Sequence, residues 1–283
     1  MIIKAFAKIN WHLAVLGQRD DGYHALDMVM QHVDLFDLLD IEPANALHLS
    51  VQGDLSLQAD ESNLVLRAAR ALQKASCGQL GARIMLQKAI PSGAGLGGGS
   101  ADAAAALYGL NEMWGLGYTQ KELQAIGLNI GADVPYCLEA RPAYVHGIGE
   151  RIKPFRLDSI FHLVIVKPQE SLSTKDVFAA FRSRDAVRRR PIAQEVIAAL
   201  SSGSISLLKN SAINDLQQPA IALLPAIKRA IDGLYALGAG FAQMSGSGSA
   251  VFGVFQNSDE AAYACCRIKD SYAFCQACST LGS

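Results

Sequence analysis

Residues 91–107 read PSGAGLGGGSADAAAAL, and five glycines and a proline lie among the first nine of them. A chain omits so many side chains only where its backbone turns sharply or must come close to another group. The preceding residues 82–90, ARIMLQKAI, favour a β-strand, and the alanines favour a helix that begins at Ser100 or Ala101. The sequence therefore predicts a strand, a glycine-rich loop and a helix in succession.

Three kinds of phosphate-binding loop compete to explain this pattern. A Walker A loop requires a lysine where Ser100 directly follows Gly99, so that interpretation fails. Gly93, Gly95 and Gly98 satisfy G-x-G-x-x-G, but the second strand with its acidic residue, which a dinucleotide fold needs, does not follow. The third is a nucleoside triphosphate loop without a lysine, in which backbone N–H groups at a helix start bind anions. A plain connector rarely needs five glycines, because each costs conformational entropy, so phosphate binding is favoured.

The composition is that of a globular protein. The 283 residues suffice for two ordinary domains or one large one, 51% of them are hydrophobic, and the net charge is −1. This charge gives no electrostatic footprint for nucleic acid or a membrane surface, and no apolar run approaches the roughly 18 residues of a membrane span. The first ten residues do not resemble a signal or transit peptide. We therefore expect a cytoplasmic protein, a monomer or weak homodimer, that binds no nucleic acid and no membrane.

Six cysteines raise the question of metal or redox chemistry. A C-x-x-C pair, Cys275 and Cys278, lies in a strand-like tail, and no histidine follows Cys265 to complete a metal site. Thiols in a reducing compartment behave as small hydrophobic side chains, which is the favoured interpretation here. The remaining cysteines are Cys77, Cys137 and Cys266.

Strand and helix patterns alternate along the whole chain, which indicates an α+β or α/β class. Ser62 is the expected N-cap of a helix that ends at Gly78. The pattern restarts after about residue 155, and we therefore place a domain boundary there. The predicted domains are 1–155, which binds ATP and carries the catalytic residues, and 156–283, which binds substrate.

Several segments together resemble one known family. PSGAGLGGGSADAA resembles the P-x-x-x-G-L-G-G-G-S-S-x-A-A motif of the GHMP kinases, and MSGSGSAVFGVF from Met244 is similar to their third, glycine-rich motif. AKIN (7–10), DGYH (21–24) and GADVPY (131–136) are similar to one branch, whose acceptor alcohol carries a cytidine diphosphate group. Ala101 replaces the second serine of the loop motif, which leaves Ser100 to carry any hydroxyl role alone.

The resemblance implies a two-domain α+β fold with an active site between the domains. The N-terminal domain would be ribosomal protein S5 domain 2-like, and the C-terminal domain ferredoxin-like. The family phosphorylates small-molecule alcohols with ATP and Mg²⁺, whose ligands in this chain stay unknown. The residues implied for ATP are Asn63, Leu64 and Lys88 near adenine and, in the loop, Pro91, Ser92, Gly93, Ala94, Gly95, Leu96, Gly97, Gly98, Gly99, Ser100 and Ala101. Lys88 also suits a solvated strand end, and Ser100 also suits a helix N-cap.

The catalytic residues implied by the resemblance are Asp133 and Lys8. Asp133 precedes Val134 and Pro135, so local sequence equally favours a helix N-cap. In the family the matching aspartate accepts the proton of the attacking hydroxyl. A lysine in a strand is most often a solvated or edge residue, but the matching lysine of the family keeps the aspartate ionised. Asn10 lies on the same face as Lys8 and is implied to bind the substrate alcohol.

The acceptor pocket is implied by four further residues. Tyr23 would stack on the cytosine base, and His24 would bond its edge, although both also suit a surface turn. Thr174 and Phe178 would complete the pocket, with Phe178 closing the other side of the aromatic sandwich. Phe178 equally suits a core position. The rival functions are a kinase for homoserine or mevalonate, and a nucleotide sensor without catalysis.

Overall fold

The computed structural model describes residues 1–20, 22–54, 57–76, 78, 80–181 and 192–283. By their internal contacts these residues form two compact units, neither of which is a continuous stretch of chain. Unit 1 comprises Met1–Ala7, Leu35–Ser92 and Gly97–Ala140, and unit 2 comprises Lys8–Asp34, Gly93–Leu96 and Arg141–Ser283. The ends of the glycine-rich loop therefore belong to unit 1 and its middle to unit 2. The domain boundary near residue 155 stays a prediction.

Two long strands contribute residues to both units. They are β1 (Ile2–Gln18) and β2 (His24–Pro43). In unit 1 the last residues of β2 pair antiparallel with β4 (Ala82–Gln87), which pairs parallel with β3 (Leu47–Gln52). The helices of unit 1 are α1 (Leu64–Ser76), α2 (Gly98–Trp114), α3 (Gln120–Leu128) and α4 (Val134–Cys137).

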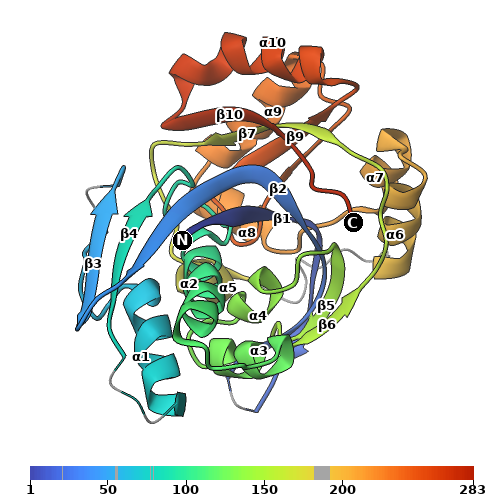
Figure 1. Cartoon of the computed structure of the whole chain (residues 1–283). Coiled ribbons are helices and arrows are strands. Elements are labelled where there is room, and N and C mark those ends of the chain that lie inside the picture. The colour runs from blue at the N-terminus through green and yellow to red at the C-terminus, as the bar shows by residue number, and fades with distance from the viewer. Residues whose placement is uncertain (21, 55–56, 77, 79, 182–191) are drawn as a thin grey trace. The chain divides into compact units, whose positions relative to one another are not determined.

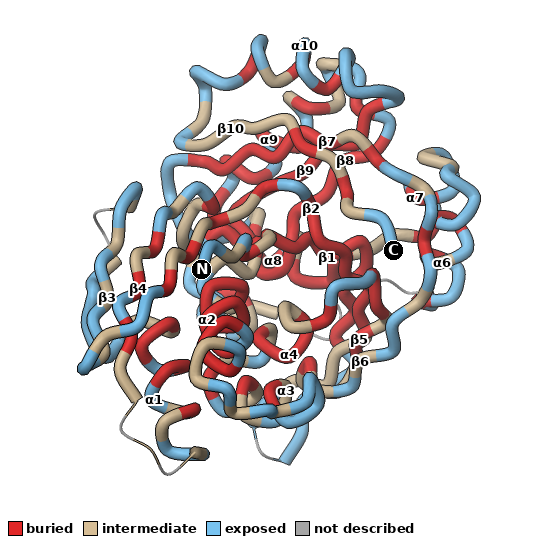
Figure 2. Tube along the Cα trace, in the orientation of Figure 1, coloured by how far each residue is buried: buried red, intermediate tan, exposed pale blue. Residues whose placement is uncertain are grey.

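The core of unit 1 is built around α2, which is buried over most of its length (Figure 2). Its alanines let neighbouring elements approach closely, and α1 packs along it. A Cβ atom on Gly109 would overlap Cδ1 of Ile3 and lie 2.7 Å from Cδ1 of Ile41. A larger residue here would require these two side chains to shift, so the glycine lets α2 pack closely against them.

Unit 2 contains a four-stranded antiparallel sheet in the order β10-β7-β9-β8 (Figure 1). Helix α9 packs on β8 and β9, and α10 packs on β7 and β10, as expected for the ferredoxin-like arrangement. The first half of β2 pairs with β5, and β5 pairs with β6. The strands that first appear here are β5 (Ala143–Gly147), β6 (Arg151–Pro154), β7 (His162–Lys167), β8 (Phe241–Met244), β9 (Val251–Phe255) and β10 (Phe274–Ser279). The helices are α5 (Thr174–Ala180), α6 (Ala193–Ser201), α7 (Ile205–Ser211), α8 (Gln217–Leu223), α9 (Ala226–Ala236) and α10 (Ser258–Ile268), with a 3₁₀ turn at Lys269–Ser271.

The predicted α+β class and the succession of strand, loop and helix are confirmed, but two helix starts were predicted wrongly. Helix α2 begins at Gly98, because Gly97 caps it in the left-handed conformation with φ 71°. Helix α1 begins at Leu64, and its cap is Asn63, whose Oδ1 accepts a 3.0 Å hydrogen bond from the backbone N of Val65. The hydroxyl of Ser62 instead donates to Asp60.

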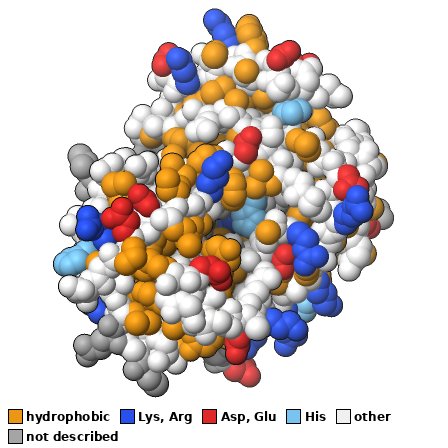
Figure 3. Space-filling view, in the orientation of Figure 1, with side chains coloured by type: hydrophobic (Ala, Val, Ile, Leu, Met, Phe, Trp, Pro, Cys, Tyr) orange, Lys and Arg blue, Asp and Glu red, His pale blue; other side chains and the backbone are white. Residues whose placement is uncertain are grey.

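Two surface properties bear on partners. Figure 3 shows basic and acidic side chains interspersed on the face in view, in keeping with the net charge of −1. No helix in the described part of the chain combines the length and apolar character that crossing a membrane requires.

Candidate active site

The middle of the glycine-rich loop is fixed by three hydrogen bonds within unit 2. The carbonyl oxygen of Ala94 accepts from the N of Ala250 at 3.0 Å, and that of Leu96 accepts from the N of Lys8 at 2.9 Å. The carbonyl of Gly95 accepts from the Oγ of Ser245 at 3.0 Å. Gly95 has φ 75°, and a Cβ atom on it would overlap the Ser245 carbonyl. The loop therefore needs glycine here both for its conformation and for this close approach.

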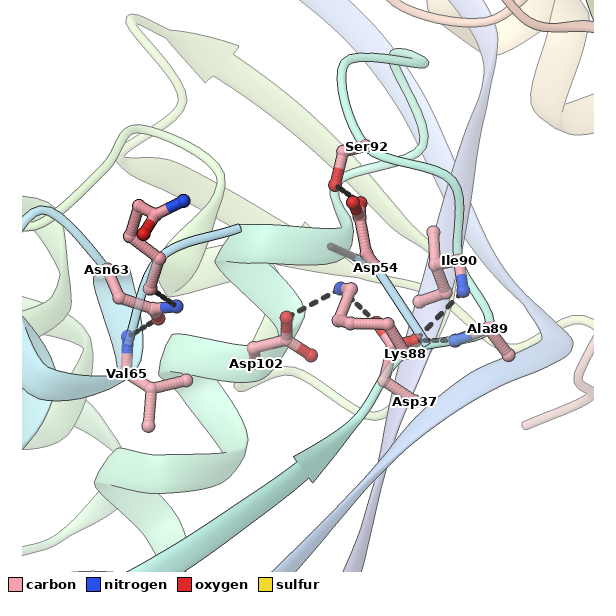
Figure 4. A network of polar contacts seen from close by, with 10 residues as sticks. Asp37, Asp54, Asn63, Val65, Lys88, Ala89, Ile90, Ser92 and Asp102 are labelled. Atoms are coloured by element: carbon pink, nitrogen blue, oxygen red, sulfur yellow. Dashed lines mark hydrogen bonds and ion pairs between the residues drawn. The ribbon is translucent and has the colours of Figure 1, made fainter. Parts of the chain in front are cut away.

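The ends of the loop are held by a buried charged cluster within unit 1, shown in Figure 4. Nζ of Lys88 lies at the end of the strand before the loop and forms ion pairs with Asp37 and, at 2.7 Å, with Asp102 in α2. Oδ1 of Asp37 also accepts from the backbone N of Ala89 and of Ile90, at 2.5 and 2.8 Å. All three charged side chains are at most 3% exposed. The interpretation of Lys88 as a solvated strand end is therefore wrong.

The cluster contains two carboxylates and one ammonium, and burial together with these charges shifts the pKa values of Lys88 and Asp102. Burial by itself would lower the pKa of Lys88, but the carboxylates of Asp102 and Asp37 raise it above its usual value. Burial raises the pKa of Asp102 to about 7, against the opposing effect of the Lys88 ammonium. Asp37 accepts from two backbone N–H groups as well as from the ammonium.

Nearer the loop's start, the hydroxyl of Ser92 donates a 2.7 Å hydrogen bond to Asp54. Asp54 follows β3, the parallel neighbour of β4, so this bond ties the loop to the turn after the adjacent strand in unit 1 (Figure 4). Asn63 and Leu64 lie where α1 begins, as predicted for them. Their contact with adenine stays a prediction, as does that of Lys88, whose ammonium is already engaged by two carboxylates.

Asp133 stands at the N-cap position of α4 but does not cap it. Its backbone is helical, with φ −87°, and its side chain accepts no capping hydrogen bond from the first turn. The interpretation of Asp133 as a capping aspartate is therefore wrong, because capping residues hold an extended backbone that aims their oxygen at the turn. Oγ of Ser100 lies 3.7 Å from the place where a Cβ atom on Gly131 would stand. Within unit 1 the predicted serine and the predicted base thus come from neighbouring segments.

Lys8 and Asn10 are buried side by side on β1 in unit 2. Nζ of Lys8 donates to Oδ1 of Asn10 at 2.7 Å, and the two side chains share one face of the strand as predicted. Lys8 is only 3% exposed, so the interpretation as a solvated or edge residue is wrong. Its charge is felt by His32, whose pKa is lowered to about 4, first by burial and then by the Lys8 ammonium.

The third glycine-rich segment, residues 244–249, turns between β8 and β9 beside this strand in unit 2. Nδ2 of Asn214 donates to the carbonyls of Met244 and Gly246, at 2.9 and 2.8 Å. A Cβ atom on Gly246 would lie 3.4 Å from Nζ of Lys8. The hydroxyls of Thr174 and Ser247 are 2.8 Å apart. This segment thus connects Lys8 with a predicted substrate residue.

The four predicted acceptor residues are only partly brought together. The rings of His24 and Phe178 stack with centroids 4.8 Å apart and planes 27° from parallel. Phe178 is half-buried, so the interpretation as a core residue is wrong. Tyr23 is 60% exposed and precedes His24 in the turn. The structure therefore places His24, rather than Tyr23, against the ring of Phe178, while the roles of all three in base binding stay predictions.

The cysteines show no features of a reactive or metal-binding site within the described residues. Sγ of Cys265 lies 3.3 Å from Sγ of Cys275, and both are free thiols. Burial raises the pKa of Cys275 and of Cys278 well above the usual value. The part of the chain that the structure describes holds no group of three or more potential metal ligands, and Cys77 lies outside that part.

Sequence reasoning missed Asp37 and Asp102, which support the glycine-rich loop, and Asn214, which supports the third glycine-rich segment. Asp37 could have been found from the sequence, since period-two alternation puts it on the same face of β2 as Leu35 and Leu39, which are buried. A charged residue on an apolar face is a candidate for a buried ion pair. No sequence pattern identifies Asn214, because its partners lie thirty or more residues away along the chain.

The comparisons with known proteins agree with this geometry. Residues 63–141 match the family model described as "GHMP kinases N terminal domain", and residues 196–273 match "GHMP kinases C terminal". A protein of Carboxydothermus hydrogenoformans is 40% identical over 92% of this chain and 90% of its own length. One of Clostridium botulinum is 40% identical over 96% of this chain and 97% of its own. Both are named "4-diphosphocytidyl-2-C-methyl-D-erythritol kinase".

Solved structures give the same pattern. The chain matches a crystal structure of 4-(cytidine 5'-diphospho)-2C-methyl-D-erythritol kinase with a TM-score of 0.86 and 35% identity, over 100% of both chains. It also matches homoserine kinase from Cytophaga hutchinsonii with a TM-score of 0.72, over 98% of this chain and 94% of the other. At 19% identity the latter match shows a shared fold alone.

Proposed function

Because this chain belongs to the GHMP kinase family, we propose that it is an ATP-dependent kinase for 4-diphosphocytidyl-2-C-methyl-D-erythritol. It transfers the γ-phosphoryl group to the 2-hydroxyl of this alcohol, a step of non-mevalonate isoprenoid precursor synthesis. The observation that carries the proposal is that relatives at about 40% identity, matched over nine-tenths or more of each chain, bear the name of this kinase.

On the ATP side, the glycine-rich loop supplies backbone N–H groups and the N-terminal dipole of α2 for the β- and γ-phosphates. The left-handed cap at Gly97 and the bonds to Ala94, Gly95 and Leu96 support this role, because they fix the loop before the nucleotide arrives. Asn63 and Leu64, at the start of α1, contact adenine. The ammonium of Lys88 already pairs with Asp37 and Asp102, so Lys88 contacts adenine through its other atoms.

Mg²⁺ accompanies ATP, and the residues present fit it. Mg²⁺ usually takes one or two protein oxygens and is otherwise held by water and substrate phosphates. Ser100 offers a hydroxyl in the first turn of α2, beside the segment that carries Asp133. When bound, the ion neutralises the charge of the triphosphate.

The proton of the attacking hydroxyl goes to Asp133. Its carboxylate is not used to cap α4, which suits a general base. The Lys8 ammonium stabilises negative charge on the attacking oxygen, and its bond to Asn10 fixes its direction. Asn10 orients the alcohol through its side-chain amide. No covalent enzyme intermediate is needed, because phosphoryl transfer rests on positioning and charge stabilisation.

The cytosine base is recognised in unit 2 by the aromatic residues near His24. The stacked rings of His24 and Phe178 supply aromatic faces, and the exposed ring of Tyr23 lies next to His24 in the chain. A flat base binds such faces well, at about 1–3 kcal/mol for each stacked base. Thr174, whose hydroxyl lies beside Ser247, completes the pocket. We keep a cytoplasmic location and a monomer or weak homodimer as predictions.

One assay separates this function from its rivals. The release of ADP is measured with 4-diphosphocytidyl-2-C-methyl-D-erythritol, homoserine or mevalonate as acceptor. We expect turnover with the cytidyl alcohol only, because the two smaller alcohols have no base for the aromatic residues. Turnover with homoserine or mevalonate would assign another branch of the family, and binding of ATP without turnover of any alcohol would indicate a nucleotide sensor.

A further inference from the structure

Asp37 is a fully buried carboxylate that no part of the proposed chemistry uses. It lies on β2 among apolar neighbours on the same face of the strand, with 0% of its side chain exposed. A buried charge is costly unless it is paired and hydrogen-bonded. Asp37 meets this condition with three partners that all lie at the entrance to the glycine-rich loop, as Figure 4 shows.

At the entrance to the loop, Asp37 holds the backbone directly. Its Oδ1 accepts from the N–H groups of Ala89 and Ile90, the last two residues before Pro91. Its Oδ2 accepts from Nζ of Lys88. One carboxylate thus fixes three consecutive residues, and it thereby determines the direction in which the chain leaves β4 and enters the loop.

At the exit from the loop, the same cluster reaches α2. The Lys88 ammonium donates at 2.7 Å to Oδ2 of Asp102, four residues after the helix begins at Gly98. A Cβ atom on Gly98 would lie 3.4 Å from Nζ of Lys88, so the ammonium also packs against the first residue of the helix. Lys88 therefore connects both the end of β4 and the start of α2 to Asp37.

We propose that Asp37 is a positioning residue for the phosphate-binding loop, acting through Lys88 and through the backbone of Ala89 and Ile90. It sets the spacing between the strand end and the N-terminus of α2, and thereby the direction of the N–H groups that meet the triphosphate. This inference rests on the proposed function, since it takes the loop to bind ATP.

The two carboxylates of the cluster are not equivalent. Asp37 uses both oxygens, whereas Oδ1 of Asp102 has no hydrogen-bond partner within the described residues. A buried cluster with one excess negative charge is stabilised when it binds a proton, and the unpartnered Oδ1 of Asp102 is the oxygen that binds it. The raised pKa of Asp102, about 7, agrees with this assignment. Neutralising Asp102 therefore disturbs the loop less than neutralising Asp37 does.

The test compares Asp37→Asn, Asp37→Ala and Asp102→Asn in the full chain. Asp34→Asn serves as a matched control, because Asp34 lies on the same strand and also accepts from a backbone N–H, that of Ser279. Calorimetry measures the Kd of a non-hydrolysable ATP analogue with Mg²⁺, and ADP release measures the KM values of ATP and acceptor. Thermal unfolding reports on folding, and Asp37→Asn decides the test if Asp37→Ala does not fold.

We expect both Asp37 variants to raise the analogue's Kd and the KM of ATP by about 10-fold to 100-fold, with the acceptor KM unchanged. Asp34→Asn stays close to the unaltered protein, and Asp102→Asn raises the analogue's Kd by less than either Asp37 variant does. A Kd that is unchanged in Asp37→Asn, or equal losses for ATP and acceptor, would overturn the inference. An unaltered chain that binds the analogue but phosphorylates no alcohol refutes the proposed acceptor and leaves the positioning role intact, whereas one that binds no nucleotide refutes both.

Discussion

Nζ of Lys8 donates a 2.7 Å hydrogen bond to Oδ1 of Asn10, and both side chains are buried on β1. The neighbouring backbone is fixed as well, since the N of Lys8 donates to Leu96 in the glycine-rich loop and the N of Asn10 donates to Ser245. The ammonium is thereby held in one place beside the third glycine-rich segment. A cation with so little freedom is suited to stabilising charge as it develops on an oxygen.

Replacing Lys8 with methionine keeps the length of the side chain and removes its charge. We expect kcat to fall by about 10²-fold to 10³-fold, as for the loss of one preorganised electrostatic contact. The pKa of His32 should rise above about 4, because the ammonium is the second cause of its depression. Steady-state kinetics and an NMR titration of His32 measure the two effects. An unchanged kcat would remove Lys8 from the proposed chemistry.

Gly95 tests whether the loop must keep its backbone conformation. In Gly95→Ala the new Cβ overlaps the carbonyl of Ser245, so we expect the KM of ATP to rise by about 10-fold or more. Gly117→Ala is the matched control, because Gly117 has φ 72°, close to the 75° of Gly95, but nothing lies within 4 Å of its Cβ position. The control should lose about 1–3 kcal/mol of stability through backbone strain and keep its KM. Equal KM values in the two variants would contradict the close approach.

The stack of His24 on Phe178 tests how the acceptor is recognised. Phe178→Ala removes one stacking face, so we expect the acceptor KM to rise by about 10-fold to 100-fold while the KM of ATP stays unchanged. Phe178→Tyr keeps the ring and should retain most of the affinity. If Phe178→Ala instead raises the KM of ATP, the aromatic pair does not serve the acceptor.

The lowered pKa of His32 predicts that the protein loses stability in mild acid. Its pKa is about 4 in the folded chain, against the ordinary histidine value of 6.5 in the unfolded chain, so the unfolded chain binds more protons between these limits. The contribution of His32 to the free energy of unfolding is fully present above pH 6.5 and is lost as the pH falls towards 4. About 2 kcal/mol of it is lost at pH 5. Urea unfolding at pH 7.5 and 5.0 should show a smaller loss in His32→Gln than in the unaltered chain. The exposed His48, replaced by glutamine, should leave the loss unchanged.

The sequence was sufficient to predict those features that depend on local chemistry. The five glycines predicted the turn from strand to helix, and the two-residue spacing of Lys8 and Asn10 predicted their common face. What it could not predict depends on partners distant along the chain. Asp37 meets Lys88 fifty-one residues later, and no local pattern pairs them. The failure of Asp133 to cap α4 likewise follows from its backbone angles, which its residue type alone does not determine.

The most direct test of the account is the rate of ADP release with 4-diphosphocytidyl-2-C-methyl-D-erythritol in the unaltered chain and in Asp133→Asn. The amide keeps the shape of the side chain but cannot take the proton of the hydroxyl. We predict turnover in the unaltered chain and a rate about 10²-fold to 10⁴-fold lower in the variant, which should unfold at a similar temperature. Equal turnover in the two proteins would contradict the assignment of Asp133 as the base, and no turnover in either would contradict the proposed reaction.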